Sequence, residues 1–298
     1  MIEMLSSPLM QRALIVAVLV GISAPVVGTY LVQRGMALMG DGIGHISLTG
    51  VALGWLAAGA MGLSPNDVLA IPGAIVASLI GAILIEVVRS RGRTGGDVAL
   101  AMLFYGGIAG GVLLIRIAGG TTTNLTSYLF GSIATVSTAD VRYTVALAAV
   151  ILLIGLGLRG PLFLLSHDEE FARSSGLPVR ALNILVAVVA ALTVSVSMRV
   201  VGVLLVSAIM IVPVAVAQLL SSSFVRTMYI AQAIGVVACL AGLIITYHVA
   251  ASPGATIVML LIGLYAVVAI TNLSIEGVRR SRRAAVVSNE PCSRESDD

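Results

Sequence analysis

Residues 12–32, "RALIVAVLVGISAPVVGTYLV", form an apolar run whose single charge, Arg12, stands at its start. About 20 apolar residues in a helix are enough to cross the hydrocarbon core of a bilayer. The run is long for a secretory signal peptide, an acidic residue precedes it at Glu3, and further apolar runs follow it. We therefore predict that this segment is an uncleaved first transmembrane helix.

Similar apolar runs recur along the rest of the chain. The 298 residues are 58% hydrophobic and 10% charged, with a mean hydropathy of +1.08, whereas ordinary soluble domains are about 25% charged. This composition predicts an all-α integral membrane protein, a polytopic bundle of about nine transmembrane helices. The number could be eight or ten, because Arg199 and Gly202 mark either a tight outer turn or a broken helix. The predicted spans are 12–32, 37–61, 66–88, 98–118, 138–158, 180–198, 200–219, 227–248 and 254–273.

The arginines predict how the chain is oriented in the membrane. Cytoplasmic loops carry an excess of basic residues, and the arginine-rich segments here are 89–93, 159–180 and 279–283. The uncharged linker 119–138 is expected on the outer side. We thus expect a multi-pass cell-membrane protein surrounded by lipid, with a transmembrane domain at 1–276. A cytoplasmic tail at 277–298, first basic and then acidic, is expected to be disordered.

The stretch "GDGIGHISLTG" (40–50) places Asp41 and His45 inside the second predicted span. A separation of four residues puts both side chains on one helix face. If the span begins after Arg34, His45 lies roughly 16 Å along the helix, near the midplane. An intramembrane carboxylate costs at least about 2.5 kcal/mol unless it faces protein or water. The two groups could form a structural polar pair, but imidazole with carboxylate also suits zinc, manganese or iron, and we favour half of a metal site.

The sequence also limits how a transported ion could be driven. No nucleotide-binding loop of the form GxxxxGK[ST] occurs, and no soluble stretch is long enough for an ATPase domain. Energy must come from a partner or from an ion gradient, in which case Asp41 and His45 would be a proton relay of a secondary transporter. No nucleophile with its base is evident for an enzyme. The net charge of +3 belongs to arginines beside apolar runs and does not indicate a nucleic-acid partner.

The segment "GDGIGHISLTGVALG" (40–54) resembles the GDxxxHxxLxGVAxG segment of the permeases of metal-ion ABC importers, the zinc, manganese and iron uptake family. The resemblance continues in the same order along the chain, from about residue 12 to 270. Its other parts are "LTSYLFGSIATVSTADV" (125–141), the long block at 169–217, and "GATIVML" (254–260).

This resemblance implies an ABC importer permease architecture with defined partners. The permease would be a homodimer, with a second copy of itself, two cytoplasmic ATP-binding subunits and an extracytoplasmic metal-binding protein. Asp41 and His45 would hold the metal in its path. No cofactor would be bound permanently, because the divalent metal is cargo, and ATP hydrolysis would belong to the partner. The chain is then a transport subunit and not an enzyme.

The loop 159–180 has an acidic run that ends at Gly176 and Pro178. From its residues alone it could be a solvated connector. The resemblance implies instead that it contains the coupling helix that docks into the ATPase. The residues expected to couple the two proteins are Glu169, Glu170, Phe171, Ala172 and Gly176.

One segment departs from the family pattern. The family often reads Y-x-x-D-x-P-x-G before its last helix, where this chain reads "YHVAASPGAT", with Ala250 in place of the acid and a displaced Pro253. This difference bears on the choice of metal or its entry route. His248 is predicted to be either a weak outer metal ligand or an anchor at the membrane interface, and His167 to be exposed or at the ATPase interface.

Overall fold

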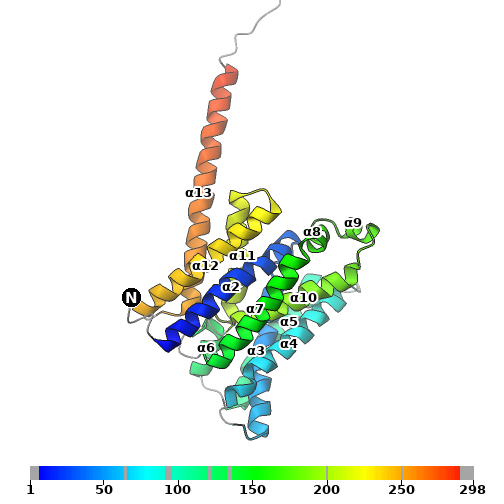
Figure 1. Ribbon diagram of the computed structural model, residues 1–298, viewed down its shortest axis with the longest axis vertical. Coiled ribbons are helices and arrows are strands. Elements are labelled where there is room, and N and C mark those ends of the chain that lie inside the picture. Colours follow the sequence, from blue (N-terminus) through cyan, green and yellow to red (C-terminus); the bar gives the residue numbers. More distant parts are fainter. Residues whose placement is uncertain are drawn as a thin grey trace, which may run out of the picture.

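The computed structural model describes residues 7–63, 66–90, 96–119, 122–132, 136–198, 201–249 and 251–288. Within these ranges the chain is helical and contains no strand, and nine helices are long and apolar enough to cross a membrane (Figure 1). The predicted fold class is confirmed. The spanning helices are α2 (Pro8–Gln33), α3 (Met39–Ala60), α4 (Ala70–Ser90), α5 (Gly96–Ile117), α7 (Thr138–Gly157), α10 (Val179–Ser197), α11 (Val206–Leu220, extended by η2), α12 (Phe224–His248) and α13 (Pro253–Ser288).

Short helices connect several of the spans. They are η1 (Asn66–Leu69), α6 (Thr122–Phe130), α8 (Arg159–His167), α9 (Glu169–Ser174) and η2 (Val203–Leu205). Helices α8 and α9 lie close to the C-terminal end of α2 (Figure 1). The arginine-rich loops predict that this end of the bundle faces the cytoplasm, and we call it the cytoplasmic end.

Helix α2 runs through the middle of the bundle and packs against α7, α10, α11 and α12. Its contact with α12 depends on Gly21 and Gly235: a Cβ added to Gly21 would lie 2.8 Å from the Cα of Val236, and one added to Gly235 would lie 2.5 Å from the carbonyl oxygen of Gly21. On the other side, the hydroxyl of Tyr30 donates to the carbonyl of Gly155 at 2.5 Å. Small residues allow such close helix packing in membranes, where there is no hydrophobic force between helices.

Helices α3 and α4 meet backbone to backbone. A Cβ added to Gly50 or Gly54 of α3 would overlap the facing backbone carbonyl of Gly73 or Leu69, and one on Gly73 would overlap the carbonyl of Gly50. The absence of side chains at these glycines therefore sets the α3–α4 distance.

The break between α10 and α11 lies inside the bundle. Gly202 has φ 89° and ψ 151°, a backbone conformation that is essentially restricted to glycine. After it, the carbonyl of Val203 lies 3.3 Å from the position that a Cβ on Gly44 would occupy. With 15 residues, α11 is about 22 Å long, shorter than the roughly 30 Å hydrocarbon core. The structure has α10 and α11 as two separate spans among the nine found in the described residues, and α11 begins beside α3.

The structure differs from the sequence prediction at two places. The linker 119–138 contains α6, which was not expected. The tail was predicted to be disordered from residue 277, whereas α13 continues to Ser288 and extends beyond the rest of the bundle (Figure 1). Arginine and alanine, which are frequent in this part, are good helix formers. Residues 289–298 lie outside the described part of the chain.

Candidate metal site and coupling segment

Asp41 and His45 lie in the first two turns of α3. Asp41 is half-buried and belongs to the first turn, where the positive end of the helix dipole favours a carboxylate. His45 is 2% exposed. Their separation of four residues puts them one above the other on the same face. The predicted arrangement on one helix face is therefore present.

A hydroxyl group from another helix holds the carboxylate of Asp41. Ser207, the second residue of α11, donates a hydrogen bond from its Oγ to Asp41 Oδ1. Ser207 is itself 7% exposed. Because α11 begins at this level of the bundle, its N-terminus adds a second favourable dipole next to the carboxylate. A carboxylate offers about four lone-pair positions, so this bond leaves capacity to coordinate a cation.

The imidazole of His45 has a free nitrogen. Its Nδ1 is buried and has no hydrogen-bond partner within the described part of the chain. The ring meets Phe104 of α5 edge-on, with 4.4 Å between centroids and 82° between planes. Helix α5 can come this close because Gly107 has no side chain. A Cβ at this position would lie 2.6 Å from the backbone carbonyl carbon of His45. An unpaired imidazole nitrogen is a donor available to a metal.

A cavity of about 310 Å³ opens beside the pair. It is lined by α3 and α5, with Asp41 and Phe104 among the lining residues, whereas His45 is not among them. Phe104 both contacts the imidazole and lines the cavity that Asp41 lines.

The described residues do not complete a metal shell. Within them, no group of three or more His, Cys, Asp or Glu side chains could hold an ion. Two side chains from one helix leave at least half of the positions of a four- or six-coordinate shell to water, backbone or another chain. His248 does not join the pair: it is exposed at the end of α12, with its ring 5.4 Å from that of Tyr247. Its role stays a prediction, and Ala250 lies outside the described residues.

The predicted coupling segment forms α9. Asp168 caps it by accepting a hydrogen bond from the amide of Phe171 at 2.9 Å, as expected for an aspartate at this position. Gly176 ends the segment with a φ of 80°, which glycine adopts without strain. The structure thus explains why the helix begins and ends where it does.

The side chains of α9 point in different directions. Phe171 is 56% exposed and Glu170 is also exposed, so both are accessible to a partner. Ala172 is fully buried. The carboxylate of Glu169 instead contacts arginines at the ends of neighbouring spans.

Sequence reasoning did not identify Ser207 or Phe104 as part of this site. Ser207 is the only hydroxyl in "VLLVSAIMIV" (203–212), and a lone polar residue in an apolar run is a signal that could have indicated it. Phe104 carries no such signal, because one more aromatic residue in an apolar helix is unremarkable.

Within the described residues, nine apolar helices long enough to cross a membrane make the chain a multi-pass membrane protein. The chain belongs to the ABC 3 transport family, whose model matches residues 6–272. It is a transport subunit of the metal-ion ABC importer class and a multi-pass protein of the plasma membrane. The resemblance found in the sequence is confirmed.

Known proteins are similar to the chain over most of its length. The manganese import system permease protein ScaB of Streptococcus parasanguinis is 36% identical over 84% of this chain and 86% of its own. The chelated iron transport system membrane protein YfeD of Yersinia pestis is 32% identical over 87% of this chain and 84% of its own. The solved structure of PsaBC from Streptococcus pneumoniae in complex with Fab matches with a TM-score of 0.78 and 33% identity, covering 90% of this chain and 93% of that chain.

Proposed function

We propose that this permease imports manganese(II) or iron(II), and that the metal passes between Asp41 and His45. The observation that carries the proposal is the half-buried Asp41 beside a cavity, one helical turn from the buried His45 with its unpaired nitrogen. Carboxylate, hydroxyl and water oxygens with one imidazole suit manganese and iron. The names of the relatives, which include a manganese import permease and a chelated iron transport protein, support the same two metals. Zinc, which the sequence also allowed, is not a metal that these two names give.

A second copy of the chain is proposed to complete the site. Helix α5, which lines the cavity, presents exposed apolar side chains in a single chain, including Met102 at 68% and Tyr105 at 69%. Such a face needs lipid or protein against it. A second copy packed there would bring another Asp41 and another His45 toward the first pair, while lipid would cover the remaining apolar surface.

ATP-binding subunits are proposed to drive transport through α9. The exposed Phe171 and Glu170 at the cytoplasmic end support a docking surface, and movement there would shift the spans as rigid bodies. An extracytoplasmic metal-binding protein would deliver the metal on the other side. The chain then provides the path, and the partner provides the hydrolysis.

The test is uptake of radioactive manganese and iron by vesicles that contain the permease, its ATPase and its binding protein, with and without ATP. We expect ATP-dependent uptake that Asp41→Asn and His45→Ala reduce at least about 100-fold, because the loss of a residue that only orients a metal ligand already costs about 10- to 100-fold. Thr271→Ala is the control, because it removes an exposed polar side chain of α13 that donates a hydrogen bond to the carbonyl of Val268 in its own helix. Uptake that ignores ATP and follows a proton gradient would instead support the secondary transporter.

A further inference from the structure

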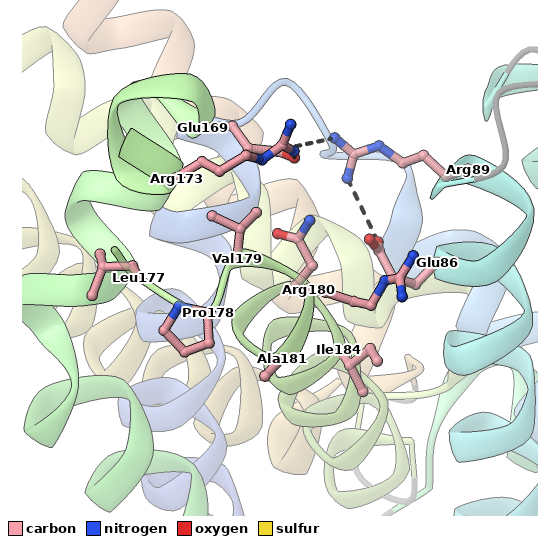
Figure 2. A pocket seen from close by; sticks show the side chains of 11 residues that line it. Glu86, Arg89, Glu169, Arg173, Leu177, Pro178, Val179, Arg180, Ala181 and Ile184 are labelled. Carbon is pink, nitrogen blue, oxygen red and sulfur yellow. Dashed lines mark hydrogen bonds and ion pairs between the residues drawn. The ribbon is translucent and has the colours of Figure 1, made fainter. Parts of the chain in front are cut away.

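A group of charged side chains joins α9 to two spans at the cytoplasmic end. Glu169 pairs with Arg34 at 3.5 Å, with Arg89 at 3.9 Å and with Arg173 of its own helix at 3.3 Å. Arg89 in turn pairs with Glu86 at 3.6 Å. Figure 2 shows Arg89 of α4 between the two glutamates, beside a cavity of about 900 Å³.

Arg34 is the most buried member of this group. It caps the C-terminal end of α2, and its side chain is 4% exposed. One guanidinium nitrogen, Nη2, donates to Asn183 Oδ1 at 2.8 Å. The other, Nη1, is buried and has no hydrogen-bond partner within the described residues. Glu169, whose own side chain is 36% exposed, therefore supplies a carboxylate to a buried charge.

The pKa of Arg34 is consistent with this position. Burial lowers it from its ordinary value, as does the nearby Arg89, and the carboxylates of Glu169 and Glu86 oppose these effects. The guanidinium stays charged, because arginine is effectively never deprotonated in proteins. The attraction to Glu169 is thus present at every physiological pH.

Arg34 stands directly before the helix that carries the metal site. Only residues 35–38 separate it from Met39, where α3 begins, and Gly35 there has a φ of 66°. Arg89 lies at the end of α4, which packs tightly against α3. One carboxylate on α9 therefore contacts the residues that precede α3 and the end of its packing partner.

We propose that Glu169 is a positioning residue that transmits the movement of α9 to α3 through its ion pairs with Arg34 and Arg89. This inference rests on the proposed function, and it assigns Glu169 a role inside the permease rather than at the ATPase surface. Phe171 and Glu170 would contact the ATPase, while Glu169 passes their displacement to the spans. Loss of Glu169 would then leave the ATPase bound and active but poorly connected to the metal site.

The experiment measures manganese transported per ATP hydrolysed, using the permease with its ATPase and binding protein in vesicles, together with the affinity for the ATPase. We expect Glu169→Gln to lower the transported metal per ATP about three- to fivefold, the effect expected for a half-exposed ion pair, with unchanged ATPase affinity. Arg180→Gln is the matched control. Arg180 is exposed, lines the same cavity and takes part in none of the ion pairs found in the described residues.

A double variant guards against a folding defect. If Glu169→Gln strands the buried Arg34 and the protein misfolds, Glu169→Gln with Arg34→Met removes both charges and tests the same connection. The double variant should lose no more coupling than either single variant, because the two residues act as one unit. Additive losses, a normal ratio in both variants, or a loss of ATPase affinity would overturn the inference. The proposed function fails separately, if the unmodified complex shows no ATP-dependent uptake.

Discussion

Replacing Ser207 with alanine should slow metal uptake without unfolding the permease. The Ser207 hydroxyl donates to Asp41 and is almost completely buried. A hydrogen bond to a charged group contributes about 1.5–3 kcal/mol, which corresponds to a factor of roughly 10 to 150. Loss of a residue that orients a metal ligand typically costs about 10- to 100-fold in affinity or activity. We therefore expect uptake at low metal concentration to fall by about 10- to 100-fold.

The assay is the initial rate of radioactive manganese uptake over a range of concentrations, with assembly checked by size-exclusion chromatography. Ser197→Ala is the matched control. Ser197 is also buried, but its hydroxyl donates at 2.8 Å to the carbonyl of Thr193 in its own helix, so its removal should change little. If Ser207→Ala transports like the unmodified protein, or if both serine variants lose the same activity, the hydrogen bond to Asp41 does not position the ligand.

Three glycine substitutions test other parts of the structure. Gly202→Ala forces a side chain into a glycine-only conformation and against the carbonyl of Leu129. It should lower the free energy of unfolding by about 1–3 kcal/mol, measured as a melting temperature a few degrees lower. Gly107→Val should push α5 away from His45. It should lower the free energy of unfolding by about 1–3 kcal/mol and abolish uptake. Gly176→Val places a β-branched residue at a φ of 80° and should reduce ATPase binding, measured by co-purification.

Two other glycines serve as controls for these changes. A Cβ on Gly160 of α8 or Gly263 of α13 would meet no atom within 4 Å in the described part of the chain. Alanine at either position should leave melting temperature, uptake and ATPase binding unchanged. If Gly202→Ala melts at the temperature of these controls, the break before α11 does not need glycine. If Gly107→Val transports normally, the close approach of α5 to His45 is not required, and unchanged ATPase binding by Gly176→Val would refute the explanation for the end of α9.

The spans could be predicted from the sequence because their signal is local. A run of about 20 apolar residues has few alternatives, and the predicted boundaries fall within a few residues of the apolar spans observed, although α13 itself continues to Ser288. Asp41 and His45 could be found for a related reason, since charged and titratable groups are costly in an apolar helix and stand out. Helix α6 was missed because its polar sequence "TTNLTSYLF" is too short and too hydrophilic for this test.

Which residues pair with one another at the site could not be predicted, because the partners come from distant parts of the chain. Ser207 reaches Asp41 across 166 positions, and only the break at Gly202 brings it to that level of the bundle. Arg34 and Glu169 are far apart in the sequence as well, and each alone is most simply a charged residue at a membrane boundary. Their pairing depends on how α2 and α9 pack, which no local pattern encodes.

The glycine contact between α3 and α4 has a consequence for the speed of transport. Gly50, Gly54 and Gly73 have no rotamers to exchange, so no side-chain rearrangement can absorb a shift of one helix against the other. The two helices, which include His45 and Arg89, should therefore move as one rigid body. Rotations of exposed side chains take picoseconds to nanoseconds, whereas collective helix movements take microseconds to milliseconds. The metal site should therefore open and close on the slower of these two timescales.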